Sequence, residues 1–255
     1  MSSTIFITGG ALGIGAGAVK KFLQEGWNVG FMDLNEEKAH ELIAASAYPE
    51  RMHFVKGDTK VHADIKKAAA AVKERFGQIN ALFANAGIHR SNTVLNISDE
   101  ELDLMINTNI YGTVNTLRTV VPYIIEAGGG AVVITASDQV MIGKAHSFAY
   151  GLTKGALGQI TKSLAIDLAP YHIRVNAVCP STIKTPLVDN IFSKLEASTG
   201  VSAEEYWKEE NSLFLRGEAG TPEEVAEMVY FLISDKAGFC TGAHYLLDGG
   251  LTAGI

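Results

Sequence analysis

Short runs of apolar residues alternate with longer stretches of helical periodicity along the 255-residue chain. The apolar runs have the length of strands and predict seven of them, at 4–8, 28–33, 52–58, 80–87, 130–137, 173–180 and 243–250. The stretches between them predict helices over 14–25, 35–47, 64–77, 98–126 with a break, 146–169, 187–198 and 221–234. Strands that are apolar on both faces and alternate with helices are typical of a parallel sheet covered on both sides. The pattern therefore predicts an α/β fold, a Rossmann-type doubly wound parallel sheet, in a single domain over 1–255.

A glycine-rich turn, TGGALGIG at 8–15, joins the first predicted strand to the first helix. Gly9 would permit the tight turn, and Gly13 and Gly15 would let the backbone approach a pyrophosphate over the positive end of the helix. This spacing differs from the usual G-x-G-x-x-G of dinucleotide-binding proteins, although 13–18 fits a variant of it. A turn with a purely structural role is the alternative.

Asp33 ends the second predicted strand, where a carboxylate can accept hydrogen bonds from the ribose of an adenine nucleotide. It would repel a 2′-phosphate, and neither neighbour of Asp33 is an arginine or lysine that could reverse this preference. The position thus favours NAD over NADP. The alternative is a helix N-cap, a role for which Asn35 competes.

Tyr150 and Lys154 lie four positions apart in AYGLTKGAL at 149–157, so they share one face of a predicted helix. An ammonium group beside a phenol lowers the pKa of the phenol, because the positive charge favours the phenolate. Tyr150 would then serve as a proton donor and acceptor near neutral pH. The alternative is a core tyrosine beside a lysine that reaches solvent.

These three motifs together resemble the short-chain dehydrogenase/reductase family, and the likeness covers essentially the whole chain. Ser137 lies thirteen residues before Tyr150, as the family's catalytic serine does. Further matches are ANAG at 84–87, NTNIYG at 107–112, IRVNAVCPSTIKT at 173–185 and the terminal LDGG. Two positions depart from the family pattern: Ala84 replaces an asparagine, and Ser181 replaces a glycine. If position 181 needs a positive φ, the serine costs on the order of 1 kcal/mol.

The resemblance implies a role for each matching residue. Tyr150 would be the general base in alcohol oxidation, with Lys154 lowering its pKa and Ser137 hydrogen-bonded to the substrate oxygen. Asn109 would hold a local helix distortion, with Asn107 as the alternative position. The cofactor contacts implied are Gly9, Gly13, Ile14, Gly15, Asp33, Leu34, Asp58, Thr59, Asn85, Ala86, Gly87, Tyr150, Lys154, Pro180, Ile183 and Thr185. Asp58 has an alternative role as the cap of the helix that starts near Val61.

The substrate is expected to lie against Asp138, Gln139 and His146, with 181–215 acting as a lid. Because SDQV at 137–140 is polar, it favours a hydroxylated substrate. We therefore predict an NAD-dependent oxidoreductase that interconverts a secondary alcohol, such as a polyol, sugar-like or cyclic alcohol, with its ketone. The alternatives are an NADPH-dependent ketone or 3-oxoacyl reductase and a non-catalytic nucleotide-binding scaffold. His89, Arg90 and Lys144 could also face the cleft, or be solvated surface charges.

The composition of the chain limits the kinds of partner that we expect it to bind. The chain has 21 basic and 28 acidic residues, and a net charge of −7 disfavours nucleic acid and anionic lipid. Cys179 and Cys240 match neither a disulfide framework nor a metal site. No apolar run approaches the ~20 residues that span a bilayer, and no signal peptide is recognisable, so we expect a soluble cytoplasmic protein. The family resemblance implies a homotetramer that pairs the helices at 98–126 and 146–169.

Overall fold

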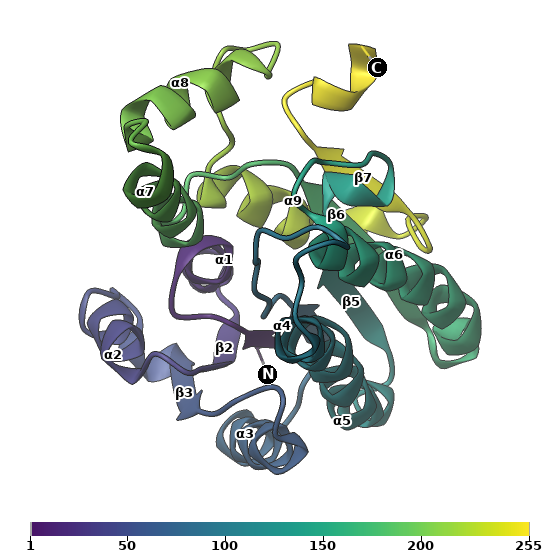
Figure 1. The fold of residues 1–255 in the computed structure, drawn as a ribbon. Coiled ribbons are helices and arrows are strands. Elements are labelled where there is room, and N and C mark those ends of the chain that lie inside the picture. Colours follow the sequence, from purple (N-terminus) through teal and green to yellow (C-terminus); the bar gives the residue numbers. More distant parts are fainter. Residues whose placement is uncertain (1, 255) are drawn as a thin grey trace.

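The computed structural model describes residues 2–254, which form a parallel sheet in the order β3-β2-β1-β4-β5-β6-β7 (Figure 1). The strands are β1 (Thr4–Thr8), β2 (Asn28–Asp33), β3 (Met52–Lys56), β4 (Ala81–Ala84), β5 (Gly130–Thr135), β6 (Ile173–Pro180) and β7 (His244–Leu247). The predicted doubly wound parallel sheet is confirmed. The strand order reverses between β1 and β4, and in such sheets ligands bind outside the carboxyl ends of the strands at this point.

Helices cover both faces of the sheet, and each face has its own hydrophobic core. One face carries α1 (Gly13–Gln24), α2 (Glu36–Ala44) and α9 (Pro222–Ile233), and the other carries α3 (His62–Phe76), α5 (Gly112–Glu126) and α6 (Phe148–Leu168). Ile5 and Ile7 of β1 point into the first core, and Phe6 between them points into the second. Both sides of the central strands β1, β4, β5 and β6 are therefore buried, which explains their unbroken apolar runs.

The predicted break in the helix at 98–126 is a π-helical segment, Ile106–Tyr111, between α4 (Asp99–Met105) and α5. Ser98 caps α4 by accepting a hydrogen bond from the amide of Glu101. Such π-bulges are frequent at functional sites. Asn109 is the buried residue of this segment, so the distortion turns a polar side chain into the interior.

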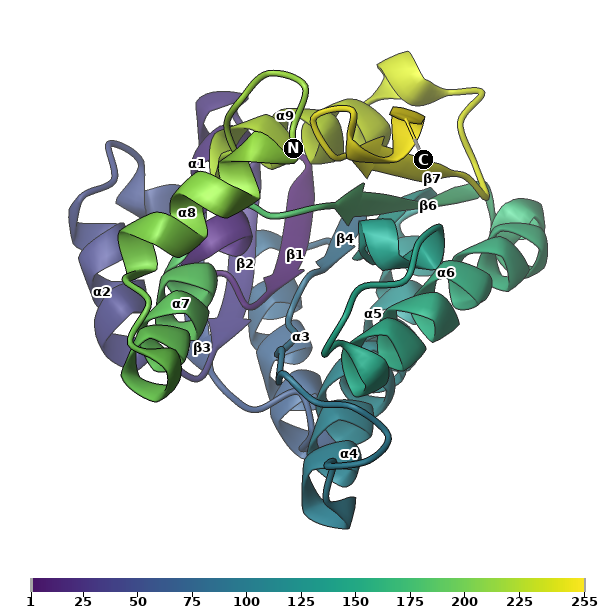
Figure 2. The same cartoon turned by 45° about the horizontal axis from the view of Figure 1, so that its top comes forward.

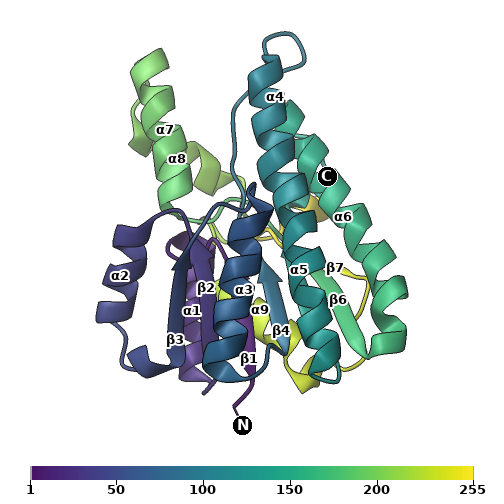
Figure 3. The ribbon, with the colours of Figure 1, turned by 90° about the horizontal axis from the view of Figure 1, so that it is seen from below.

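The segment 181–215 contains two helices, α7 (Pro186–Thr199) and α8 (Ala203–Ser212), although the sequence pattern predicted only one. Both project past the sheet on the same side as α4, as Figures 2 and 3 show from two directions. Phe192 of α7 packs against Tyr206 and Trp207 of α8. The prediction missed α8 because its sequence, AEEYWKEENS, is polar on most sides and only two aromatic residues mark its packed face.

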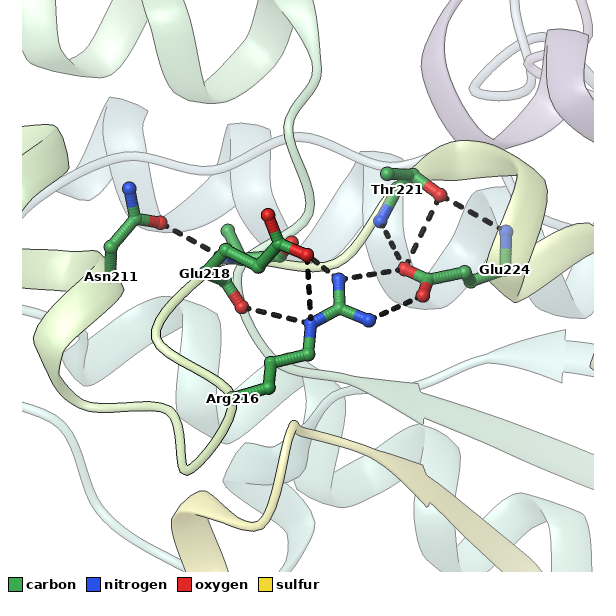
Figure 4. A network of polar contacts seen from close by, with 6 residues as sticks. Asn211, Arg216, Glu218, Thr221 and Glu224 are labelled. Carbon is green, nitrogen blue, oxygen red and sulfur yellow. Dashed lines mark hydrogen bonds and ion pairs between the residues drawn. The ribbon is translucent and has the colours of Figure 1, made fainter.

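Arg216 ties the chain beyond α8 to the start of α9 (Figure 4). Its guanidinium contacts the carboxylate of Glu224 through both Nη atoms, and Nη2 also donates to the backbone oxygen of Ala219 at 2.8 Å. Glu224 completes a capping box with Thr221 at the first turn of α9. The Arg216 guanidinium holds the pKa of Glu224 at about 2, well below the usual range of a carboxyl. Arg216 therefore joins the chain that follows α8 to α9, a helix that packs on the sheet.

Candidate active site

The glycine turn after β1 is held in place by the turn after β4. The Asn85 side-chain amide donates to the backbone oxygens of Thr8 and Gly9 at 3.2 and 3.1 Å. The Thr8 hydroxyl in turn accepts from the amides of Asn85 and Ala86 at 3.1 and 3.2 Å. Gly9 and Gly13 have φ values of +66° and +53°, a region that favours glycine. The two turns thus form one rigid unit at the point where the strand order reverses.

Gly15 is required by close packing. A Cβ atom at this position would lie 1.9 Å from the backbone oxygen of Gly9, so α1 could not approach the turn with any larger residue. A Cβ atom on Gly13 would meet the Thr185 side chain at 3.1 Å, which places the start of α7 beside the turn. Within the described chain, no side chain caps α1 and its first turn has no acidic residue. These features suit an anionic group over the helix N-terminus.

Asp33 is bonded to the glycine turn and does not cap α2. Its carboxylate accepts hydrogen bonds from the amides of Ala11 at 3.0 Å and Asn35 at 2.9 Å. Asn35 is the cap, because its side chain accepts from the amide of Lys38. Lys56 is the register partner of Asp33 on β3, and its ammonium is paired with Glu36 at 3.0 Å. The alternative in which Asp33 caps the helix is therefore wrong.

The other predicted adenine-side residues lie at the neighbouring strand ends. Asp58 accepts from the amide of Lys60 at 2.9 Å, and α3 starts after Val61 without a side-chain cap, so Asp58 does not cap α3. Thr59 is buried, and Gly112 at the start of α5 approaches it so closely that a Cβ there would lie 2.8 Å from the Thr59 hydroxyl. Leu34 is largely exposed, and Ile14 packs against the first core.

Tyr150, Lys154 and Ser137 meet beyond the carboxyl end of β5, as their spacing predicts. The Lys154 ammonium lies 5.5 Å from the centre of the Tyr150 ring and donates to the backbone oxygen of Thr135 at 2.7 Å. The Ser137 hydroxyl donates to Asp138 at 2.8 Å and accepts from the amide of Gln139 at 3.2 Å. These contacts fix the orientation of both the lysine and the serine.

Contrary to the expected lowering, the pKa of Tyr150 is raised in the structure, and Lys154 is not among the groups that shift it. Burial raises the pKa of the phenol, the negative charge of Asp138 raises it further, and the neighbouring Ser137 hydroxyl acts in the opposite direction. The lysine is itself only 3% exposed, and burial lowers its pKa to about 8. Spacing along a helix could not reveal this, because desolvation depends on the tertiary environment of both groups.

Asn109 joins three parts of the site. Its side-chain oxygen accepts from the amide of Ile88 at 2.8 Å, and its nitrogen donates to the Ile88 backbone oxygen and the Thr153 hydroxyl, both at 3.0 Å. A Cβ on Gly87 would lie 3.2 Å from the Asn109 oxygen and 3.6 Å from the Lys154 ammonium. Asn107 is exposed. The helix asparagine of the motif is therefore Asn109.

The three predicted substrate residues differ in their surroundings. Asp138 contacts Ser137, and the Gln139 side-chain oxygen lies near Gly151 on α6. His146 adopts a φ of +55° with an exposed side chain, and its backbone oxygen is bonded to the amide of Asn92. The structure thus brings Asp138 and Gln139 to Ser137, whereas the described contacts of His146 are made by its backbone.

The end of β6 and the turn after it carry three of the residues predicted to contact the cofactor, Pro180, Ile183 and Thr185. Pro180 and Ile183 are buried, and the Thr185 hydroxyl donates to the Ile183 backbone oxygen at 3.2 Å. In residues 2–254 only His146 and His172 have positive φ without being glycine, so the strain expected for Ser181 does not arise. Ala84 is buried in the second core, and Asn85 supplies the amide contacts at the turn.

His89, Lys144 and Thr135 are site residues to which the family motifs assign no role. The His89 ring lies 4.7 Å from the Tyr150 ring, and burial, followed by the nearby Arg90 charge, lowers the pKa of this histidine to about 4. Lys144 is paired with Asp138 at 2.9 Å. The only sequence signals for these residues were the position of His89 after the NAG turn and that of Lys144 after the SDQV segment. Thr135 contacts Lys154 through its backbone oxygen, and the residue type gives no sign of such a contact.

Residues 9–252 match a family model described as Enoyl-(Acyl carrier protein) reductase. The chain belongs to the short-chain dehydrogenase/reductase family. This short-chain dehydrogenase is 33% identical to "Oxidoreductase UcpA" of Salmonella typhimurium, with 98% of the chain and 94% of the relative covered. It is 32% identical to 3-oxoacyl-[acyl-carrier-protein] reductase FabG of Chlamydia pneumoniae (97% and 96% covered) and to cyclopentanol dehydrogenase of Comamonas sp. (98% and 96%).

Solved structures of other short-chain dehydrogenases have the same fold. The crystal structure of a single-residue variant of actinorhodin polyketide ketoreductase with NADPH has a TM-score of 0.93 and 28% identity, with 98% of this chain and 97% of that chain covered. That of 3-ketoacyl-(acyl-carrier-protein) reductase from Brucella melitensis with NADH has a TM-score of 0.87 and 28% identity (98% and 98%). The chain is thus an oxidoreductase-family protein with a nicotinamide-cofactor fold.

Two classes of feature were searched for in the described part of the chain. No helix there is long and apolar enough to cross a membrane. No group of three or more histidine, cysteine, aspartate or glutamate side chains is placed to hold a metal ion.

Proposed function

We propose that this short-chain dehydrogenase is an NAD-dependent enzyme that interconverts a secondary alcohol and its ketone. The observation that carries the proposal is the meeting of Ser137, Tyr150 and Lys154 beside a glycine turn to which Asp33 is bonded. A proton-transferring phenol and a cofactor-binding turn at one edge of the sheet supply what alcohol oxidation requires. The substrate class we propose is a polyol, a sugar-like alcohol or a cyclic alcohol.

The residues present fit a dinucleotide. The pyrophosphate would lie over the first turn of α1, which has no acidic side chain, with the adenosine ribose at Asp33. The remaining contacts would come from the other strand ends, at Gly9, Gly13, Ile14, Gly15, Leu34, Asp58, Thr59, Asn85, Ala86, Gly87, Pro180, Ile183 and Thr185. NAD is preferred in this proposal because the cation nearest Asp33 in the sheet, Lys56, is already paired with Glu36.

In the proposed mechanism, residues at the ends of β1, β4 and β6 would hold a nicotinamide cofactor, which would supply the hydride acceptor for oxidation or the hydride donor for reduction. Tyr150 removes the proton from the alcohol oxygen, or returns it to the ketone oxygen. Ser137 contacts that same oxygen and orients it toward the phenol. Lys154 supplies a buried positive charge on the next turn of α6, and Asn109 holds the 85–88 turn against that helix. Asp138, Gln139 and, less directly, His146 would border the substrate.

Two relatives support the reaction class, the interconversion of a secondary alcohol and a ketone, through their names. One is a cyclopentanol dehydrogenase and another a 3-oxoacyl reductase, and both reactions join a secondary alcohol with a ketone. The polar groups next to Ser137 in this chain, Asp138 and Lys144, favour a hydroxylated substrate over a hydrocarbon one.

We propose further that 1–255 is one catalytic domain, that 181–215 acts as its lid, and that the protein is a cytoplasmic homotetramer. Exposed apolar side chains on the helices predicted to pair support the assembly: Tyr111, Phe148 and Leu152. The lid assignment is supported by α7, which starts beside the glycine turn at Thr185. The fold is common to enzymes that use either cofactor, so the proposed NAD preference rests on Asp33 and on the pairing of Lys56 with Glu36.

A panel of secondary alcohols with NAD or NADP, followed by the absorbance of the reduced cofactor, tests the proposal. The expected result is turnover with NAD, abolished by Tyr150→Phe and retained by Tyr171→Phe, a matched change at an exposed residue outside the site. Clear preference for NADPH and ketones would favour the reductase alternative. Binding of NADH without turnover of any substrate would favour the non-catalytic scaffold.

A further inference from the structure

A chain of polar contacts runs from the catalytic serine to the opposite wall of the site. The Ser137 hydroxyl donates to Oδ1 of Asp138 at 2.8 Å, and Oδ2 of Asp138 lies 2.9 Å from the Lys144 ammonium. The Lys144 ammonium also donates to the Ser181 hydroxyl at 3.2 Å. The chain therefore links the segment after β5 with the turn after β6, where the proposed lid begins.

Asp138 is 1% exposed, and removing a carboxylate from water is costly unless it is paired. Among the described residues, its carboxylate contacts only Ser137 and Lys144, and it binds no backbone amide that would make it a helix cap or a turn residue. The buried carboxylate therefore does not stabilise a helix cap or a turn of the local backbone. Both of its partners belong to the proposed active site or border it.

The contact with Asp138 determines what Ser137 can offer a substrate. A serine hydroxyl has one proton to donate and two lone pairs to accept with. Here the proton goes to Asp138, and one lone pair accepts from the amide of Gln139 at 3.2 Å. These contacts hold the Ser137 oxygen next to the phenol of Tyr150, and donation to a substrate oxygen would need only a turn of the hydroxyl proton away from Asp138.

The same carboxylate places a negative charge beside Tyr150. The charged and titratable groups near this phenol come from four elements: Asp138 and Lys144 after β5, His89 and Arg90 after β4, Lys154 on α6 and Cys179 on β6. Asp138 raises the pKa of Tyr150, and Lys144 carries the charge that offsets Asp138. Because Lys144 has the opposite charge, its removal would leave the negative charge of Asp138 beside the phenol without this partner.

We propose that Asp138 is a positioning residue, which orients the Ser137 hydroxyl and holds negative charge beside Tyr150, while Lys144 fixes and partly neutralises that carboxylate. The inference rests on the proposed function, because it concerns the same proton transfer. It assigns a task to two side chains outside the Ser137, Tyr150 and Lys154 set. It also explains why Ser181 at the start of the proposed lid is a hydroxyl residue, since it receives the second polar contact of Lys144.

The test is the pH dependence of kcat and kcat/KM for alcohol oxidation in wild type, Asp138→Asn, Lys144→Met and the double variant. Oxidation requires the phenolate, so activity rises with pH to a plateau. Asp138→Asn keeps the shape and a hydrogen-bond acceptor but removes the negative charge, so the midpoint should fall by about one pH unit. Lys144→Met should move the midpoint upward, and the double variant should lie between the two single variants.

The exposed pair Lys73 and Glu126, 2.8 Å apart on α3 and α5, supplies the control. Lys73→Met and Glu126→Gln should leave the midpoint unchanged. If the two residues were merely structural, both site variants would have a lower kcat, but the midpoints of their pH profiles would not move in opposite directions. Midpoints that coincide with that of wild type would overturn the inference while leaving the proposed function intact. Should Asp138→Asn not fold, Lys144→Met decides, because Lys144 is partly exposed and its removal leaves Asp138 in place. No turnover by wild type with any substrate and cofactor would refute both proposals.

Discussion

The ammonium of Lys154 and the backbone oxygen of Thr135 are joined by a 2.7 Å hydrogen bond at the end of β5. No carboxylate in residues 2–254 forms an ion pair with Lys154, although the side chain is buried. A buried charge held only by a carbonyl destabilises the folded state, and groups of this kind concentrate at functional sites. The stability of the protein should therefore improve when this charge is removed, even as its activity is lost.

Lys154→Met is expected to abolish turnover and to raise the free energy of unfolding at pH 7 by about 2 kcal/mol. Burial lowers the pKa of the folded lysine from 10.5 to about 8. Below pH 8 both states are charged and the folded state carries the full cost, and this cost disappears as the pH rises from 8 to 10.5. The advantage of the variant should therefore shrink over that range. Urea denaturation of wild type and variant at about pH 7 and about pH 10 measures the difference in their free energies of unfolding. The same difference at both pH values would contradict the prediction.

Asn109 and Asn107 offer a matched pair within one π-helical segment. Asn109→Ala removes the hydrogen bonds to Ile88 and Thr153 and leaves buried polar groups unpaired, so it should cost about 3 kcal/mol of stability and most of the activity. Asn107→Ala changes an exposed side chain and should cost less than about 0.5 kcal/mol. Chemical denaturation and kcat report both effects. Equal losses in the two variants would show that helix propensity, and not the buried contacts, determines the result.

The fold was predictable because its signals are local. Continuous apolar runs mark buried parallel strands, and residues at strand ends, such as Asp33 and Ser137, must gather at one edge. The environment of a group was not predictable in the same way. Spacing placed Tyr150 beside Lys154 correctly, but the effect of burial and of Asp138 on the phenol appears only when α6 has docked on the sheet. The failure to predict α8 has the same cause, since its packed face contacts another peripheral helix, α7.

Alanine substitutions at Gly15 and Gly238 compare a tightly packed glycine with one that has room for a Cβ atom. Gly15→Ala would place a Cβ 1.9 Å from the Gly9 backbone oxygen, so α1 and the turn must move apart. We expect a loss of about 2 kcal/mol of stability and at least about tenfold weaker NADH binding. Gly238→Ala meets only a normal contact at 3.4 Å and should stay within about 0.5 kcal/mol of wild type. Fluorescence titration with NADH and denaturation measure these effects, and wild-type NADH affinity in Gly15→Ala would exclude the proposed pyrophosphate position.

Arg216 should control how firmly the α7–α8 segment is held. Arg216→Gln removes both contacts to Glu224 and the hydrogen bond to the Ala219 backbone oxygen, while the Thr221–Glu224 capping box remains (Figure 4). Proteolysis within 186–217 should become several-fold faster, and KM should rise more than kcat falls, because the segment must then be ordered when the substrate binds.

Lys208→Gln on α8 is the control for this change, since Lys208 is an exposed cation of the same segment and should alter neither rate. The Glu224 carboxyl gives a second readout. Arg216 lowers its pKa from 4.5 to about 2, so the pair stabilises the fold above pH 4.5 and loses this contribution as the pH falls toward 2. Arg216→Gln should flatten that part of the stability curve. Unchanged proteolysis together with an unchanged acid dependence would show that Arg216 does not hold the α7–α8 segment.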